Sequence, residues 1–328
     1  MLVIADDLTG ATDAGGAFAA AGLRCVVSLN SGRLVTQGVG DGQANTHVFV
    51  VDTDSRDMTE AAARATTRDV IRRHSSRELF VKIDSTLRGH VRSTVESAVA
   101  ALPHPPQRIV VCPAFPANGR TVINGGVFVH GVQLEGPTLF EIFDRFTPTV
   151  VVEIPDIKTD ADLARIVAST PAATLWVGSA GLAYHLGQSL AVQLGEGQAR
   201  HNASRRTPLA QRVVVVAGSL HPQTAQQLRQ LAPGTNAIIL DPLDPSFGDQ
   251  VERHVRHADG LVLTGGATAR AVLEILGVET LEVSGEIEPG VPWAVGAGRF
   301  GEIAIVTKAG GFGDTLTLQR AVQFLTRP

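Results

Sequence analysis

The chain repeats one local pattern along most of its length: a short apolar run, a turn of small and polar residues, and a helical segment. Runs of this kind begin at Leu2, Leu79, Val213, Leu261 and Ile303. Continuous apolar runs are typical of parallel strands buried on both faces, and their alternation with helices favours right-handed βαβ units. The sequence therefore predicts an α/β fold.

Two such units are expected, because 328 residues suffice for two cores and one polar, proline-containing stretch interrupts the pattern. We predict a first domain at residues 1–194, a linker at 195–211 and a second domain at 212–328. Each domain should hold a mostly parallel sheet flanked by helices. Open α/β sheets bind ligands at the carboxyl ends of their strands, so the active site is expected in the cleft between the domains.

Three predictions concern single segments. The Ala- and Gly-rich residues 14–23 favour a helix packed close to the sheet, and residues 31–45 lack periodicity and indicate a loop. Residues 127–132 fit a hairpin or an edge strand.

Composition excludes several classes of function. A formal net charge of -4 provides no broad basic surface for nucleic acid, and no apolar run approaches the length that spans a membrane. Cys25 and Cys112 are too few for a disulfide framework and have no metal-ligand spacing, so a reducing cytoplasm is the simplest setting. A homo-oligomer is compatible with this composition.

The N-terminal strand runs into a group of carboxylates and hydroxyls. Asp6 and Asp7 fall where the strand should end, and Thr9, Thr12 and Asp13 follow within one or two helical turns. Three carboxylates with two hydroxyls suit a hydroxyl-rich ligand, a cation or a proton acceptor. The alternative interpretation is that Asp6 or Asp7 only caps the next helix.

A second polar group follows the strand at residues 79–83. Strand alternation places Lys82 and Asp84 on one face, and Ser85, Thr86 and Arg88 follow in the turn. Two cations and two hydroxyls beside an aspartate would bind a small carboxylate that carries hydroxyls. The alternative is a surface pair of Lys82 and Asp84 with a capping serine. Arg120 and His130 are further candidates for this site.

Three strand-to-helix turns in the second half offer small residues where backbone N–H groups could hold phosphate oxygens. Their candidate nucleotide-binding residues are Ser219, Gly265, Gly266, Ala267, Thr268, Gly310, Gly311 and Gly313. None of the turns matches a phosphate-loop or dinucleotide signature. Lys308 precedes the third turn, and it is one of only three lysines in a chain that otherwise uses arginine.

Taken in order, these segments resemble the four-carbon acid sugar kinase family. The matching stretches are IADDLTGATDAG, KIDSTLRGH, PAFPANGRT, GSAGLA, AGS, TGGATA and TKAGGFGD. The resemblance implies an acid-sugar-binding domain, a nucleotide-binding domain and transfer of the γ-phosphoryl group of ATP to the 4-hydroxyl of threonate, erythronate or 3-oxo-tetronate. It assigns the substrate side to Asp6, Asp7, Thr9, Asp13, Lys82, Ser85, Thr86 and Arg88, and the nucleotide side to the three glycine turns.

The chain departs from the family in several places. It is shorter than usual after residue 120 and between residues 219 and 264, Ala267 stands where an acidic residue is common, and His90 stands where Asn is usual. Near the position of Thr94, family members commonly carry Glu. These differences bear on the identity of the substrate more than on the reaction class.

The reaction expected from the resemblance needs a base and a divalent cation. Asp7, Asp13, Asp84 and Asp314 are the candidate bases, with Lys82 as a catalytic cation, and Mg²⁺ would arrive mainly on the ATP phosphates. Two other functions stay open. One is a non-catalytic acid-sugar sensor, suggested by the short second domain and Ala267; the other is a ribokinase-type sugar kinase, suggested by the GFGD sequence that ends at Asp314.

Overall fold

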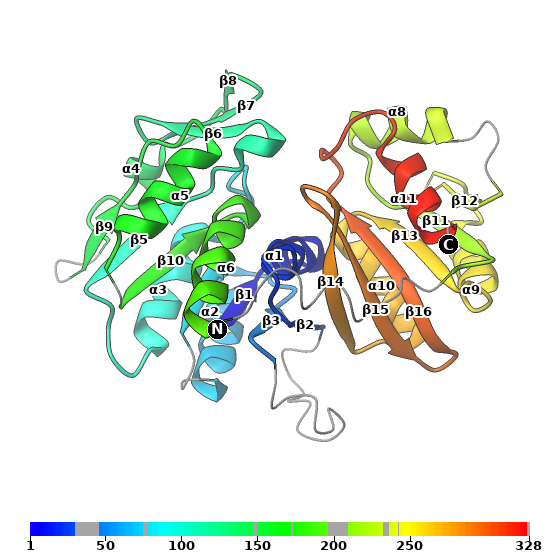
Figure 1. The fold of residues 1–328 in the computed structure, drawn as a ribbon, viewed down its shortest axis with the longest axis horizontal. Helices are drawn as coiled ribbons and strands as arrows, with labels where there is room; N and C mark the ends of the chain where they lie inside the picture. Colours follow the sequence, from blue (N-terminus) through cyan, green and yellow to red (C-terminus); the bar gives the residue numbers. More distant parts are fainter. Residues whose placement is uncertain are drawn as a thin grey trace.

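The computed structural model describes residues 1–29, 46–74, 78–146, 150–171, 173–195, 209–231, 236–241 and 243–326. The expected loop at 31–45 and most of the expected linker at 195–211 lie outside these residues. We call residues 1–195 the N-terminal part and residues 209–326 the C-terminal part. Both parts are α/β, as the sequence predicts (Figure 1).

Among the described residues, thirteen strands form one sheet in the order β12-β11-β13-β16-β15-β14-β2-β3-β1-β4-β10-β5-β9. The neighbouring strands β2-β3-β1-β4-β10-β5-β9 are parallel to one another. The neighbouring strands β12-β11-β13-β16 form a second parallel set. The bounds are β1 (Leu2–Ala5), β2 (Cys25–Ser28), β3 (Val48–Asp52), β4 (Leu79–Lys82), β5 (Arg108–Cys112), β9 (Val151–Glu153), β10 (Thr174–Gly178), β11 (Val213–Ala217), β12 (Ile238–Leu240), β13 (Gly260–Thr264), β14 (Thr280–Glu288), β15 (Val291–Gly298) and β16 (Gly301–Lys308).

The prediction of a separate sheet in each domain is wrong. β14 pairs antiparallel with β2, with Val283 opposite Cys25, and joins the two parallel sets. The physical reason lies in β14 itself, where Leu281, Val283 and Gly285 are buried and alternate with less buried residues. This period-2 strand covers the edge that β2 would otherwise leave open.

Helices cover both faces of the sheet. α2 packs against α3, α6 lies between α1 and α5, α8 packs on α11, and α9 packs on α10. The bounds are α1 (Leu8–Ala20), α2 (Glu60–Arg73), α3 (Val91–Ala101), α4 (Leu139–Ile142), α5 (Asp160–Ser169), α6 (Ala180–Leu194), α8 (Pro222–Leu231), α9 (Phe247–Val255), α10 (Gly266–Leu276) and α11 (Thr317–Thr326). The helix expected over 14–23 begins earlier, at Leu8, because the Asp7 side chain caps it.

A second, three-stranded sheet lies beside the 3-10 turn η2 (Pro116–Asn118). It contains β6 (Arg120–Ile123), β7 (Gly126–Val129) and β8 (Val132–Gln133), all antiparallel. The hairpin expected over 127–132 is therefore confirmed as the β7–β8 pair. The Phe115 and Arg120 backbones pair where the chain enters β6, so this small sheet holds Arg120 in a fixed place.

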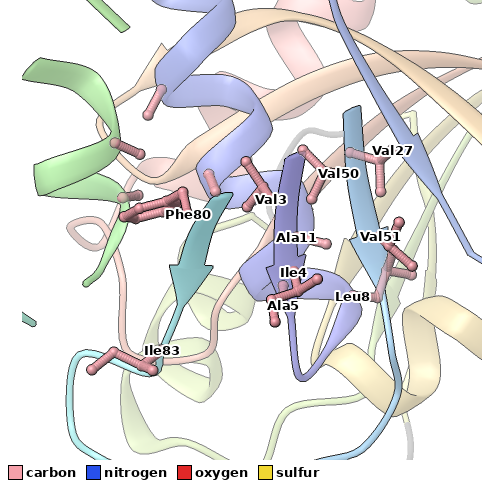
Figure 2. Packing of buried hydrophobic residues seen from close by; sticks show 14 of the residues in the cluster. Val3, Ile4, Ala5, Leu8, Ala11, Val27, Val50, Val51, Phe80 and Ile83 are labelled. Carbon is pink, nitrogen blue, oxygen red and sulfur yellow. The ribbon is translucent and has the colours of Figure 1, made fainter. Parts of the chain in front are cut away.

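The core is built on the central strands. Val3 pairs with Val50 on β3 and with Phe80 on β4, and Figure 2 shows these side chains beside Ala11 of α1. All four are at most 1% exposed, and burying a side chain of the size of Val or Phe contributes about 1.5–3 kcal/mol. The apolar N-terminal run therefore forms a buried central strand of the N-terminal part. The polar residues that follow it lie where the parallel strands have their carboxyl ends.

Helix α1 lies where the two parts meet, at the centre of Figure 1. A Cβ atom added at Gly15 would lie 3.1–3.2 Å from the side chains of Val283, Cys25 and Val27, and one added at Gly16 would lie 2.6 Å from Pro292. The small residues of α1 thus let it pack closely on β2, β14 and β15 at once. Any displacement of α1 would disturb both parts.

Candidate active site

The site begins at the carboxyl end of β1, where Asp7 has two tasks. Its Oδ1 accepts a hydrogen bond from the Gly10 N–H (2.8 Å), which caps α1. Its Oδ2 accepts from Thr9 Oγ1 (2.6 Å) and from Arg56 Nη1 (2.7 Å). Asp7 therefore caps the helix, but it does not only cap it, because the same side chain also lines a pocket.

Arg56 holds both N-terminal aspartates. Its Nε and Nη2 donate to the two oxygens of Asp6 (3.0 and 2.7 Å), while Nη1 reaches Asp7. Asp6 is thereby paired with the arginine and is not among the residues that line the pocket. Arg56 was not predicted as a site residue. The available signal was the polar run that ends at this residue, after a strand adjacent to β1.

The end of β4 provides the second group of predicted residues. Asp84 accepts from the Thr86 N–H (3.0 Å) and from Arg88 Nε and Nη2 (3.1 and 2.7 Å). Although burial alone would raise it, these hydrogen bonds and the Arg88 charge hold the pKa of Asp84 well below its ordinary value. Asp84 is therefore a fixed anion that orients Arg88, and the alternative of a surface Lys82–Asp84 pair does not hold, since both side chains are buried.

Asp13 differs from the other carboxylates. Its Oδ2 lies 3.8 Å from Lys82 Nζ, while its buried Oδ1 has no hydrogen-bond partner among the described residues. Burial raises the pKa of Asp13 to about 6, against the opposing charge of Lys82. A carboxylate on the pocket wall with a free oxygen and a pKa near neutrality can accept a proton.

The three glycine turns of the C-terminal part lie at neighbouring strand ends, since Thr264 pairs with Ala217 and with Lys308. Ser219, Gly310 and Gly311 line the pocket. Gly265, Ala267, Thr268 and Gly313 are not among its lining residues. Gly266 begins α10 beside the carboxylate of Asp7, because a Cβ added there would lie 2.7 Å from Asp7 Oδ2.

Lys308 stabilises the third turn by hydrogen bonds from its buried amine. It is 1% exposed, and its Nζ donates to the carbonyls of Ala309, Gly310 and Phe312 (2.8, 3.0 and 3.2 Å). Burial lowers the pKa of this amine to about 7. The scarcity of lysine thus identified a residue that holds the glycine turn rather than one exposed to a ligand.

Asp314 lies outside this group. Its carboxylate accepts from the Leu316 N–H (2.8 Å) and from Arg320 Nη2 (2.7 Å), and the side chain is 64% exposed. His130 also does not line the pocket, whereas Arg120 does, together with His221 and Phe312. His221 and Phe312 were not predicted as site residues. Both belong to turns whose glycines and hydroxyls were predicted to bind the nucleotide.

These residues enclose a pocket of about 260 Å³ with walls from both parts of the chain. The N-terminal part supplies Asp7, Thr9, Gly10, Asp13, Lys82, Asp84, Ser85, Thr86, Arg88 and Arg120, and the C-terminal part supplies Ser219, His221, Ala309, Gly310, Gly311 and Phe312. Thus most of the predicted substrate-side residues and part of the predicted nucleotide-side residues meet in one pocket.

The shared pocket requires a strongly twisted sheet. Three successive antiparallel pairings separate β16 from β2, so a flat sheet would place the carboxyl ends of the two parallel sets at opposite edges. Five strand steps separate β16 from β1. A twist of about 20–25° at each step accumulates to roughly 100° or more, which turns the two sets of strand ends toward each other.

In the part of the chain that the structure describes, no group of three or more His, Cys, Asp or Glu side chains could hold a metal ion. No described helix is long and apolar enough to cross a membrane.

The chain matches two family models. Residues 1–148 match one described as a sugar-binding N-terminal domain, and residues 246–318 match one described as a nucleotide-binding C-terminal domain. The chain is 30% identical to a D-threonate kinase of Cupriavidus necator, over 99% of this chain and 98% of that protein. It is 24% identical to a 3-oxo-tetronate kinase of Burkholderia multivorans, over 98% of this chain and 96% of that protein.

Two solved structures share the fold. A Salmonella typhimurium LT2 protein described as a tRNA synthase superposes with a TM-score of 0.73 at 20% identity, over 98% of this chain and 97% of that one. A Bordetella bronchiseptica protein, solved with bound citrate as a domain-swapped dimer, gives 0.50 at 26% identity, over 99% of this chain and 98% of that one.

The fold defines an α/β protein, and its pocket is lined from both the segment that matches a sugar-binding family model and the segment that matches a nucleotide-binding family model. The full-length match to a named kinase makes the grouping specific, and the chain belongs to the four-carbon acid sugar kinase family. It is a short member. The alignment with the Cupriavidus protein runs over 414 positions, so at least 86 of them (414 against 328) are gaps in this chain.

Proposed function

We propose that this chain transfers the γ-phosphoryl group of ATP to the 4-hydroxyl of a four-carbon acid sugar. One observation carries the proposal: a single pocket is lined by the carboxylates, hydroxyls and cations of the N-terminal part and by two glycine-containing turns of the C-terminal part. Phosphoryl transfer needs little covalent chemistry from the protein beyond in-line positioning and charge stabilisation. An acceptor and a donor bound from opposite walls of one pocket would meet that need.

On the acceptor side, Lys82 and Arg88 would bind the substrate carboxylate, while Thr9, Ser85 and Thr86 would bind its hydroxyls. Lys82 is buried, so its charge is little screened by solvent. The bound citrate of the Bordetella protein, a carboxylate that carries a hydroxyl, supports this chemical class. D-threonate is the first substrate to test, because the Cupriavidus relative is named a D-threonate kinase.

On the donor side, Ser219, Gly310, Gly311 and the turn at Gly265–Thr268 would hold the nucleotide. The N-terminus of α10 begins at Gly266, where free N–H groups and the helix dipole favour a phosphate. We further propose that residues 1–194 and 212–328 form the two domains and that the active site occupies the cleft between them. Mg²⁺ would neutralise phosphate charge and would arrive with the nucleotide, since this ion usually keeps several waters and binds through substrate phosphates.

Asp13 is the base we assign to the 4-hydroxyl proton. Arg56 neutralises Asp7, Arg88 neutralises Asp84, and Arg320 holds Asp314 away from the pocket. Of the four candidates, Asp13 is the one whose side chain has a buried oxygen without a hydrogen-bond partner among the described residues. Lys82, 3.8 Å away, would stabilise the carboxylate before transfer and the substrate carboxylate throughout.

The test is ADP production, measured by a coupled assay with ATP, Mg²⁺ and a panel of D-threonate, L-threonate, D-erythronate, 3-oxo-tetronate and D-ribose. Turnover of one four-carbon acid, with the phosphate located on O4 by NMR, supports the proposal. Tight binding of an acid without turnover would favour a sensor, and turnover of ribose would favour a ribokinase-type enzyme. Because the reaction consumes ATP, we expect the enzyme in the cytoplasm, and sedimentation would give its oligomeric state.

A further inference from the structure

Gly311 leaves a space that two side chains face from opposite parts of the chain. A Cβ atom placed on Gly311 would lie 3.1 Å from His221 Nε2 and 3.5 Å from Arg120 Nη2. Both side chains line the pocket. The missing side chain thus opens a position beside the glycine turn that an imidazole and a guanidinium can both reach.

The hydrogen bonds around His221 fix the direction of its proton. Nδ1 accepts from the Gln223 N–H (3.1 Å), so in the neutral ring the proton is on Nε2, the atom that faces Gly311. Partial desolvation of the ring lowers the pKa of His221, and the charges of Lys308, Arg120 and Arg88 lower it further. Near neutral pH, Nε2 is therefore a hydrogen-bond donor without a positive charge.

Arg120 reaches the same space from the N-terminal part. Its Nη1 donates to the Asn118 carbonyl, its Nη2 lies 3.4 Å from the Gly311 carbonyl, and its guanidinium stacks 4.7 Å from the centre of the Phe312 ring. The side chain is 6% exposed, yet its Nε has no hydrogen-bond partner among the described residues. Buried donors without a partner are rare in folded proteins, so this guanidinium is expected to gain a hydrogen-bond acceptor when the pocket is occupied.

The position beside Gly311 suits an oxygen of a phosphate rather than the substrate carboxylate. Ser219 and Gly310 pack together next to it, since a Cβ added at Gly310 would lie 2.0 Å from Ser219 Oγ. These are the residues proposed to hold the nucleotide, while Lys82 and Arg88 lie on the acceptor side. One hydrogen-bond donor from each part of the chain would therefore bind the phosphoryl group as it passes from ATP to the acid.

We propose that Arg120 and His221 together bind a non-bridging oxygen of the phosphoryl group during its transfer. This inference rests on the proposed kinase function. The transferred group carries its charge on three equatorial oxygens in a metaphosphate-like transition state, so donors already fixed at one of them stabilise that state without reorganisation. In this assignment Arg120, which the sequence gave little weight, contacts the reacting group directly.

The experiment compares Arg120→Ala, His221→Leu and Gly311→Ala with the wild-type protein. The first two remove one donor each, and the third places a methyl group between the donors while leaving both in place. We expect kcat to fall by about 10²–10³ in each variant, with ATP affinity changed by less than about threefold in Arg120→Ala and His221→Leu. Guanidinium ion should restore part of the activity of Arg120→Ala. His221→Gln, whose amide nitrogen replaces Nε2–H, should exceed His221→Leu by at least about tenfold.

Arg270→Ala is the matched control. Arg270 also connects the two parts, through Asp52 (2.7 Å) and the Leu29 carbonyl (2.6 Å), but it does not line the pocket. Its loss should reduce stability and leave kcat within about threefold at a temperature where the variant is folded. If Arg120→Ala does not fold, the other two variants still provide the test. His221 is exposed, and Gly311 has a backbone conformation that alanine can adopt.

A second measurement is the gain in ADP affinity on adding aluminium fluoride and D-threonate, which mimics the transferred group. Wild-type protein should show the gain, and Arg120→Ala and His221→Leu should lose it while still binding ADP. If the wild type shows turnover and the gain, but the variants keep both, the inference is wrong and the kinase function stands. If the wild type shows neither turnover nor gain with any acid of the panel, both proposals are wrong.

Discussion

Thr307 on β16 donates a hydrogen bond from its Oγ1 to the Oγ1 of Thr12 on α1, at 2.7 Å and out of contact with solvent. Thr12 in turn donates to the Leu8 carbonyl of its own helix (3.0 Å). The pair links the helix that Asp7 caps to the strand that ends at Lys308. A buried hydrogen bond therefore connects the two parts of the chain behind the pocket, in addition to the residues that face each other across it.

The first prediction is that Thr307→Val lowers the free energy of unfolding by about 1–3 kcal/mol, because it leaves the buried Thr12 hydroxyl with one partner fewer. Adding Thr12→Val should cost less than the sum of the single changes, which urea unfolding of all four proteins would measure as a coupling energy. Thr326→Val is the control, since that hydroxyl bonds only within its own helix. Fully additive changes would contradict a direct interaction.

The second prediction concerns Arg56, whose fork holds Asp6 and Asp7 together. Arg56→Lys should lower the free energy of unfolding by about 2–4 kcal/mol and raise KM for the acid, because a point charge cannot pair with both carboxylates. Arg64 also binds two carboxylates, those of Glu60 and Glu96, but outside the pocket. Arg64→Lys should lose less than about 1 kcal/mol and keep KM. Equal effects in the two variants would refute a special role for Arg56.

The third prediction separates substrate binding from nucleotide binding. Lys82→Ala or Arg88→Ala should abolish turnover, because each removes a cation proposed to bind the substrate carboxylate, while ATP affinity stays within about threefold. Equilibrium binding of ATP and steady-state kinetics would check the two effects. Lys158→Ala, at an exposed lysine that is not among the lining residues, should behave as wild type. Equal loss of ATP binding and turnover would count against this assignment.

The fourth prediction is a pH profile. With the pKa of Asp13 raised to about 6, kcat/KM should fall about tenfold for each pH unit below 6, since the base must be deprotonated to accept a proton. Asp13→Asn should reduce kcat by about 10²–10⁴ and remove that acidic limb. Asp314→Asn should keep both kcat and the acidic limb of the pH profile, because Arg320 holds Asp314 outside the pocket. A surviving limb in Asp13→Asn would exclude Asp13 as the base.

The fifth prediction concerns Glu286 on β14. Burial raises the pKa of this carboxyl to about 8, with a further contribution from Asp13. Between its ordinary pKa of 4.5 and about 8, the folded protein retains a proton that the unfolded chain releases, so stability falls as pH rises through that range. Asp52 (about 7) and Asp13 (about 6) act in the same direction.

Glu286→Gln keeps an acceptor for the Gly290 N–H but removes this titration. The variant should gain roughly 1–3 kcal/mol over wild type at pH 8 and very little at pH 4.5. Urea unfolding across this pH range measures the difference, and the exposed Glu302→Gln is the control. A gain that is the same at all pH values would show that packing, rather than ionisation, is responsible.

The sequence predicted elements whose signal is local and missed those that depend on distant partners. The apolar runs at Leu2–Ala5 and Val213–Ala217 are strands, and their polar ends line the pocket or lie beside it. β14 was not predicted, although its alternating buried residues carry a period-2 signal. That β14 would pair with β2 was not accessible, since nothing local to either strand specifies the other.

The same limit applies to the site. The groups at Asp7, Lys82 and Ser219 follow strands, where the sheet edge gathers them, and this rule predicted them. Arg120 enters from the small β6–β7–β8 sheet, and His221 acquires a role only through its distance to Gly311. Asp314 looked equivalent to the other aspartates in sequence, but the neighbouring Arg320 on α11 draws it away.

The pairing of β2 with β14 has a consequence for synthesis. Cys25 leaves the ribosome more than 250 residues before Val283, its partner in the sheet. Until then, the nascent N-terminal part exposes an unpaired strand edge next to α1, the kind of edge that recruits other chains. The last third of the polypeptide thus closes the first domain-sized unit to be translated, and a chain truncated before residue 280 should be captured by chaperones or aggregate rather than accumulate as a free sugar-binding fragment.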